Sequence, residues 1–263
     1  AGIRFQPSEP GKLVAIVALA WILSSERLPL RRLAAALASV GLLVALILLQ
    51  PDLGTVLVYV AVTVALVVVS GVRARVIVAL ALVAATGTFA VFQSDVLADY
   101  QKARLTIFLF DEEEVSPDLA PYAYNAEQAQ IAIGNGGLTG QGLFQGTQTR
   151  SDLVPEQQTD FIFTVAGEEL GFRGAGLLLG LFGLLVFRIW RIAMRARDRF
   201  DRLIAVGVMV MFLFQIFQSV GMTMGMMPVT GIPLPLVSYG GSSMITSLVA
   251  LGLVAGVHRR RFS

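Results

Sequence analysis

The sequence predicts an all-α protein, a polytopic bundle of membrane-spanning helices that carries one large structured loop outside the membrane. Of the 263 residues, 56% are hydrophobic and only 14% are charged, and the mean hydropathy is +0.74. Most of the seven apolar stretches in the chain are long enough to cross a hydrocarbon core about 30 Å thick. Each stretch is expected to be a helix, because an isolated span must satisfy its own backbone hydrogen bonds. The seven expected spans are residues 13–24, 33–49, 54–70, 76–93, 161–189, 203–227 and 242–257.

Basic residues are distributed unevenly between the connections that join these spans. Of the 20 Lys and Arg residues, 14 fall in alternate connections, which hold only three acidic residues. An excess of Lys and Arg marks the cytoplasmic connections of membrane proteins. Residues 1–8, 50–53, 94–160 and 228–241 are therefore expected outside the cytoplasm. The cytoplasmic Arg residues explain the pI of about 9.2, and no nucleic-acid-binding motif accompanies them.

The composition excludes several kinds of site. The chain contains no Cys and a single His. Disulfides, thiol chemistry and Cys-ligated metals are therefore excluded. A catalytic triad based on His and a His-rich metal site are excluded as well.

The outer segment 94–160 is expected to be a structured loop within a single membrane domain, residues 1–263. Residues 101–110 have the apolar spacing of a helix that lies in the membrane interface. Residues 122–133 are expected to form a second amphipathic helix, which ends at the glycine-rich run 134–137, where glycine permits positive φ. Loops of this length usually carry a binding surface or a lid.

Asp160 is the leading catalytic candidate. A carboxylate at the water edge of a membrane helix is costly to keep, and it is well placed to act on a membrane-bound substrate. If the helix includes Asp160, that residue shares a face with Thr164 and with Gly167 or Glu168. Structural roles are the alternative for Glu168 and Glu169, one of which would cap a helix or pair with Arg173.

Further polar residues occur at the outer ends of other spans. Glu9 and Lys12 are three residues apart and can pair on one helix face. They are candidates for substrate binding, and the alternative is a structural salt bridge at the membrane edge. Asp52 either joins this polar surface or caps the helix that follows it.

The segment 227–243 combines three prolines with several glycines at the outer depth of the membrane. Irregular backbone at this depth is tolerated where it lines a cavity. Tyr239 and Ser242 are therefore candidates for substrate binding. The alternative is a purely structural turn that re-enters the membrane.

Motifs spread over nearly the whole chain occur in the order typical of one known family. They are FQPSE (5–9), QPDLGT (50–55), YQKAR (100–104), IAIGNGG (131–137), LVPEQQTDFIF (153–163), GEELGF (167–172) and PVTGIPLPLVSYGGSS (228–243). Together they resemble the SEDS family of bacterial cell-wall proteins, which contains RodA, FtsW and SpoVE. The GTQ at 146–148 is more similar to RodA members than to FtsW members, whereas Pro10-Gly11 and Ser219 depart from the family pattern. Members have ten spans, so the resemblance implies that about three N-terminal spans are missing from this sequence.

The resemblance implies a peptidoglycan glycosyltransferase of the bacterial inner membrane, with its active face outside the cytoplasm. Its substrate would be lipid II, its role cell elongation and the maintenance of cell shape, and its partner a class B penicillin-binding protein that crosslinks the product. Asp160 matches the essential acidic residue of the family. Glu9 and Lys12 match a pair that is functional in relatives.

Transfer with inversion is the expected mechanism, with Asp160 as the base that deprotonates the acceptor 4-hydroxyl. The leaving diphosphate needs positive charge, for which Lys102 and Arg104 are the favoured residues. No cofactor is required by the sequence, although Mg²⁺ or Mn²⁺ held by Asp160 would suit a diphosphate. We expect Glu9, Lys12 and these two cations to line an open, lipid-accessible groove.

Two other functions fit parts of the sequence. A lipid II flippase would use the same polar cavity to pass a head group across the bilayer, and a non-catalytic scaffold would hold together the elongation machinery. A flippase should also carry polar residues near mid-membrane, and the spans 33–49 and 76–93 have almost none. The outer position of the acidic and loop features favours the enzyme.

Overall fold

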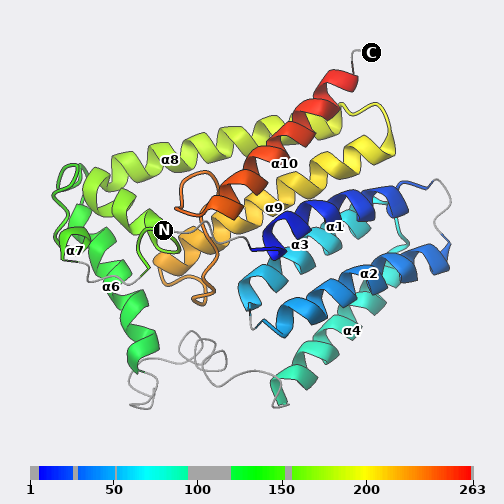
Figure 1. Ribbon diagram of the computed structural model, residues 1–263, viewed down its shortest axis with the longest axis horizontal. Helices are drawn as coiled ribbons and strands as arrows, with labels where there is room; N and C mark the ends of the chain where they lie inside the picture. Colours follow the sequence, from blue (N-terminus) through cyan, green and yellow to red (C-terminus); the bar gives the residue numbers. More distant parts are fainter. Residues whose placement is uncertain (1–5, 26–28, 51, 94–119, 152–155, 262–263) are drawn as a thin grey trace. The chain divides into compact units, whose positions relative to one another are not determined.

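The computed structural model describes residues 6–25, 29–50, 52–93, 120–151 and 156–261, and within these ranges the regular elements are all α-helices (Figure 1). The helices are α1 (Ser8–Leu23), α2 (Leu30–Leu48), α3 (Leu53–Val69), α4 (Ala74–Gln93), α6 (Ala120–Gly136), α7 (Thr147–Arg150), α8 (Ile162–Met194), α9 (Arg199–Thr223) and α10 (Gly241–Arg260). Each of the seven expected spans is a helix, which confirms the predicted all-α class. The interfacial helix expected at 101–110 lies outside the described residues.

Four helices of the described chain, α2, α8, α9 and α10, are long and apolar enough to cross a membrane. A fifth helix, α3, is equally apolar but has only 17 residues. These apolar helices identify the chain as an integral membrane protein. The longest of them is α8, with 33 residues, which is interrupted by a non-helical residue at Gly171.

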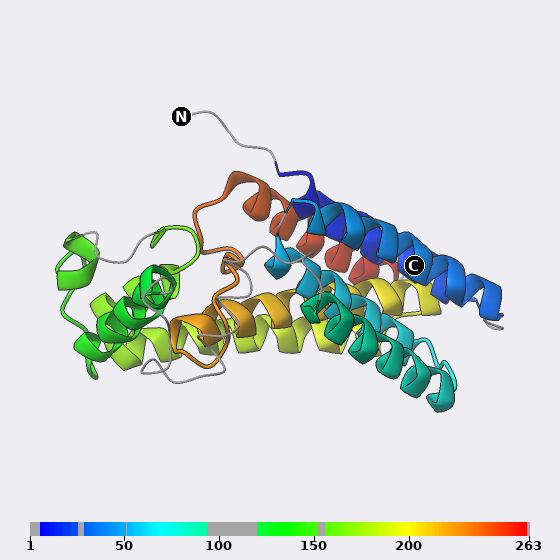
Figure 2. The same ribbon diagram turned by 90° about the horizontal axis from the view of Figure 1, so that it is seen from below.

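The chain folds into two compact units, which we describe separately; the expected single domain stays a prediction. The first unit comprises Ala1–Leu97, Val186–Phe214 and Gly241–Ser263. Within it α1 packs against α2, α3 and α10, and α2 packs against α3. In Figure 2 the first three helices of this unit are blue to cyan and α10 is red. Ile16 of α1 is fully buried, and a Cβ at Gly207 of α9 would lie only 2.7 Å from its side chain. A glycine in α9 therefore allows these two helices to cross closely.

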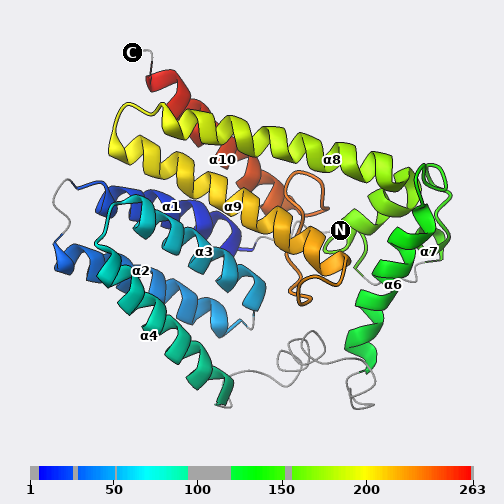
Figure 3. The ribbon, with the colours of Figure 1, turned by 180° about the vertical axis from the view of Figure 1, so that it is seen from behind.

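The second unit comprises Ala98–Leu185 and Gln215–Gly240. Its α6 confirms the helix expected at 122–133, and it ends at Gly136, followed by Gly137 with φ of 53°. In Figure 3 this green helix lies beside the short α7, and the two are in contact. The segment that follows α9 is irregular up to Gly240, as expected for its prolines and glycines. It includes three residues with positive φ, Gly225, Gly231 and Leu236.

Candidate functional site

Asp160 lies in a tight turn immediately before α8. Its backbone N–H donates to the carbonyl of Glu156 at 3.0 Å, and the N–H of Phe161 donates to the same carbonyl at 3.3 Å. The helix begins two residues later, at Ile162. The expectation that Asp160 shares a helix face with Thr164 and Glu168 is therefore wrong, because the turn around Glu156 holds Asp160 outside the helix. The expected position at the helix edge is confirmed, and the residue is half-buried.

The irregular segment 227–240 supports this turn at two points. A Cβ built on Gly231 would lie 3.0 Å from Oδ2 of Asp160, and Gly231 has φ of 70°. Glycine is therefore favoured there both by the conformation and by the nearby carboxylate. The N–H of Tyr239 donates to the carbonyl of Gln158 at 2.9 Å. The structure thus places the Tyr239 backbone against the Asp160 turn, while the tyrosine side chain is 75% exposed.

Behind the turn, α8 is broken at Gly171, which has φ of 65° and ψ of −168°. In an unbroken helix the N–H groups of residues 172 and 173 would donate to the carbonyls four residues earlier. The loop 137–142 satisfies these two N–H groups and the carbonyls of Glu168 and Glu169. The bonds are Phe172 N to Gly137 O (2.8 Å), Arg173 N to Leu138 O (3.2 Å), Gln141 N to Glu168 O (3.0 Å) and Gly142 N to Glu169 O (3.0 Å). We call this interlocked pair, residues 137–142 and 168–173, the α8 joint.

Glycine is required where the two backbone segments of the α8 joint approach each other. A Cβ on Gly140 would collide with the carbonyl of Glu169, and a Cβ on Gly171 would collide with the backbone of Gly140. Just before the joint, a Cβ on Gly136 would collide with the carbonyl of Gly167. The glycines of two motifs far apart in sequence therefore serve one close backbone contact.

Glu168 is fully buried, and its carboxylate caps the short helix α7. The carboxylate accepts hydrogen bonds from the backbone N–H groups of Gln148 and Thr149 and from the hydroxyls of Thr147 and Thr149. The capping role expected for one of the two glutamates is therefore confirmed, although the capped helix is distant in sequence. The sequence does not predict this contact, because the only local sign of it is an acidic residue close to an apolar run.

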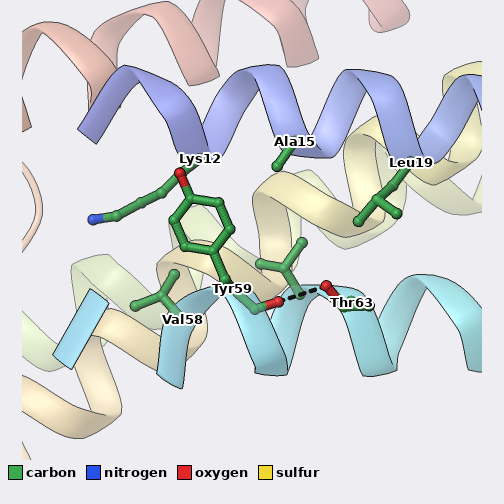
Figure 4. Close-up of a pocket in the computed structure, with 7 residues that line it drawn as sticks. Lys12, Ala15, Leu19, Val58, Tyr59 and Thr63 are labelled. Atoms are coloured by element: carbon green, nitrogen blue, oxygen red, sulfur yellow. Dashed lines mark hydrogen bonds between the residues drawn. The ribbon is translucent and has the colours of Figure 1, made fainter. Parts of the chain in front are cut away.

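In the first unit, Glu9 and Lys12 form the predicted ion pair, with Nζ of Lys12 2.5 Å from Oε1 of Glu9. Both residues are only 3% exposed, which differs from the open groove expected of them. They can be buried together because each charge neutralises the other. Lys12 also lines a small cavity of about 10 Å³ between α1 and α3, beside Tyr59. Figure 4 shows the Tyr59 ring extending from α3 toward α1 at this point.

Ser242 is also buried, and it holds the start of α1. Its hydroxyl oxygen accepts from the N–H of Gln6 at 3.0 Å, and the side-chain amide of Gln6 donates to Asp52 at 3.2 Å. The other carboxylate oxygen of Asp52 accepts from the N–H of Thr55 at 2.9 Å, which confirms the expected helix cap. The polar side chains at the outer ends of α1, α3 and α10 therefore lie close together in the first unit.

The candidate residues thus fall into two groups. Glu9, Lys12 and Ser242 lie in the first unit, and Asp160 and Tyr239 lie in the second. The predicted cations at 102 and 104 lie outside the described residues. Among the residues that are described, no group of three or more His, Asp or Glu side chains could hold a metal ion.

Comparison with known proteins identifies one family along the whole chain. A model of cell cycle proteins of the FtsW, RodA and SpoVE group matches residues 1–262. The chain is 38% identical over 262 residues to the peptidoglycan glycosyltransferase MrdB of Escherichia coli K12, covering 98% of this chain and 69% of MrdB. It is 45% identical over 166 residues to the peptidoglycan glycosyltransferase RodA of Treponema pallidum, covering 63% of this chain and 37% of that protein.

Solved structures agree with this match. One, described as showing the structural coordination of polymerization and crosslinking by a peptidoglycan synthase complex, is similar with a TM-score of 0.77 and 36% identity. That match covers 100% of this chain and 72% of the solved chain. The rod shape determining protein RodA of Thermus thermophilus is similar with a TM-score of 0.63 and 35% identity, over 98% of this chain and 67% of that one.

Proposed function

We propose that this chain, which belongs to the FtsW, RodA and SpoVE family, is a peptidoglycan glycosyltransferase that polymerises lipid II. The observation that carries the proposal is the position of Asp160. Its carboxylate is half-buried in a turn at the start of a membrane helix, with the backbone of Gly231 beside it. A carboxylate held in a fixed turn at this depth can reach a sugar that a lipid carries at the membrane surface.

Asp160 is the general base of an inverting transfer. It accepts the proton of the acceptor 4-hydroxyl while that oxygen forms a bond to the anomeric carbon of the donor. The bond from this carbon to the diphosphate oxygen breaks, and undecaprenyl diphosphate leaves with the electron pair. Because the attack comes from the face opposite the leaving group, an α-linked donor gives a β-1,4-linked glycan.

Positive charge is needed where the diphosphate leaves. Lys102 and Arg104 are the residues proposed to supply it, with Mg²⁺ or Mn²⁺ as a further source. Such a cation would be held by Asp160 and diphosphate oxygens, an oxygen ligand set that suits these ions. Glu9, Lys12, Tyr239 and Ser242 remain proposed contacts of the substrate.

The site faces outward from the bacterial inner membrane. The excess of Lys and Arg in the connections on the opposite side supports this orientation. The partner is a class B penicillin-binding protein that crosslinks the new glycan, which is supported by the likeness to a protein of a peptidoglycan synthase complex. The GTQ at 146–148 favours a role in elongation and cell shape.

The test is polymerisation of labelled lipid II by the purified protein with its partner, comparing wild type with Asp160→Asn. Asn keeps the size of the side chain but removes its basicity, and general base catalysis contributes about 10²–10⁴-fold. The product should therefore vanish in an ordinary assay, while co-purification of the partner is kept. Glu156→Gln, an exposed substitution in the same turn, is the matched control and should polymerise normally. A flippase or a scaffold would make no polymer even as the wild type, and polymer from Asp160→Asn at the wild-type rate would remove the catalytic role.

A further inference from the structure

The carboxylate of Glu168 is saturated with hydrogen-bond donors. Its Oε1 accepts from the Thr147 hydroxyl at 3.2 Å and from the Gln148 N–H at 2.8 Å. Its Oε2 accepts from the Thr149 N–H at 3.0 Å and from the Thr149 hydroxyl at 2.7 Å. An ionised carboxylate is acceptor-only and offers about four lone-pair positions. Four donors therefore match it fully, and this match lets the carboxylate be buried.

The Thr149 hydroxyl continues this network toward Asp160. It donates its proton to Glu168 and accepts a hydrogen bond from the side-chain amide of Gln157 at 3.2 Å. Gln157 is buried, at 8% exposure, and lies three residues before Asp160. The turn between them is short, and the Asp160 N–H donates to the carbonyl of Glu156. A shift of Gln157 is therefore transmitted to Asp160.

We propose that Glu168, Thr149 and Gln157 form a positioning relay that holds Asp160 in its reactive place relative to α8. This inference rests on the proposed catalytic role of Asp160. The three residues act through Asp160 and are therefore positioning residues. Glu168 is fixed in α8 by the α8 joint, its carboxylate fixes Thr149, and Thr149 fixes Gln157 and the turn that follows. A displacement of Asp160 lowers the catalytic rate, because reacting groups must be aligned. A displacement of about 1 Å can reduce the rate about 10²-fold.

The relay needs a carboxylate of the length of Glu. In Glu168→Gln, one oxygen becomes an amide NH₂ that would face a backbone N–H and a hydroxyl, both of which are donors in the wild type. The hydroxyl can turn to accept, but the N–H cannot. In Glu168→Asp the carboxylate would be withdrawn by one methylene, about 1.5 Å of side chain, and would no longer reach both donors of Thr149.

Thr149 offers the sharpest test because two substitutions separate its hydroxyl from its shape. Thr149→Val keeps the shape and removes the link to Gln157, whereas Thr149→Ser keeps the link. With the full complex and labelled lipid II, Thr149→Val should lower kcat by about 10- to 10²-fold with an unchanged KM, and Thr149→Ser should restore kcat to within about threefold. Gln157→Leu should match Thr149→Val. Its matched control, Gln158→Leu, changes the exposed neighbouring side chain and should behave as the wild type.

The outcomes separate this inference from the proposed function. A wild-type rate for Asp160→Asn would remove the catalytic role on which the relay rests. If Asp160→Asn is inactive while Thr149→Val keeps the wild-type kcat, the relay is wrong and the proposed function stands. Equal losses for Thr149→Val and Thr149→Ser, together with a lowered thermal midpoint, would assign Thr149 to folding and also overturn the relay. A relay further requires that Glu168→Gln combined with Thr149→Val be no slower than the slower single variant.

Discussion

Gly11 of α1 and Tyr59 of α3 meet so closely that their substitutions should be coupled. A Cβ at position 11 would lie 2.6 Å from the Tyr59 hydroxyl oxygen, while the next nearest atom, Cζ of the same ring, is 3.9 Å away. Tyr59 is 3% exposed, and its hydroxyl donates to the carbonyl of Ser8 at 3.1 Å. The ring therefore has little room to move, and Gly11→Ala should destabilise the first unit through this one oxygen.

The magnitude follows from two opposing effects. Overpacking a core site costs about 1–3 kcal/mol, and exchanging Gly for Ala inside a helix returns about 0.5–1 kcal/mol. Gly11→Ala should then lose about 1 kcal/mol net near the middle of these ranges. Tyr59→Phe should lose a similar amount, because a hydrogen bond contributes about 0.5–1.5 kcal/mol. In the double variant the clash is absent, since 3.9 Å is an ordinary contact, and the helix gain offsets the lost bond. The double variant should therefore be close to wild type in stability.

Thermal unfolding of the purified protein in detergent measures this coupling with four proteins and one control. Gly252→Ala in α10 is the control, because a Cβ there meets no atom within 4 Å, so it should unfold at or slightly above the wild-type midpoint. Gly11→Ala should unfold below wild type, and adding Tyr59→Phe should raise the midpoint again. Strictly additive losses in the double variant, or a Gly11→Ala protein as stable as the control, would refute the reasoning.

The buried pair and the α8 joint give two further predictions. Lys12→Met leaves the Glu9 carboxylate buried without its cation and should cost about 3–5 kcal/mol, seen as a lower unfolding midpoint. Adding Glu9→Gln should recover most of that loss, and a double variant that is stable yet inactive would support substrate binding by the pair. Gly140→Ala places a Cβ against the carbonyl of Glu169 and should reduce both folded yield and polymerisation, whereas Gly176→Ala, with open space around it, should change neither. Normal yield and activity for Gly140→Ala would show that the two segments of the α8 joint can move apart without loss of function.

The elements that the sequence predicted well depend on local patterns. Apolar stretches located the helices α1 to α4 and α8 to α10, because the length and hydropathy of a span are properties of the segment itself. The helix cap by Asp52 and the pairing of Glu9 with Lys12 could also be predicted from the sequence, since both involve residues three positions apart. In each case the interacting groups belong to one helix and its first turn.

The burial of a residue was harder to predict from the sequence, because it depends on neighbouring elements. The spacing of Glu9 and Lys12 predicts their contact but not whether α3 and α10 cover them. The expected open groove rests on the gathering of these two residues with Lys102 and Arg104 near one membrane surface. The spacing of four residues between Asp160 and Thr164 is typical of two residues on one helix face, so it predicts a helical position for Asp160. The turn closed by the Glu156 carbonyl requires positive φ at Glu156, 51° in the structure, which nothing in a run of polar residues indicates.

The break in α8 shows most clearly why part of the site could not be predicted. Gly171 stands in a long apolar run, where glycine is common in membrane helices and does not by itself end them. A break at membrane depth is stable only if other groups satisfy the released backbone, and here those groups come from a loop about 30 residues earlier. The glycine-rich run 134–137 and the loop after it therefore do more than end α6. They hold α8 at the point where Glu168 projects toward α7, so the two glycine motifs act as one element, and the proposed base Asp160 depends on both.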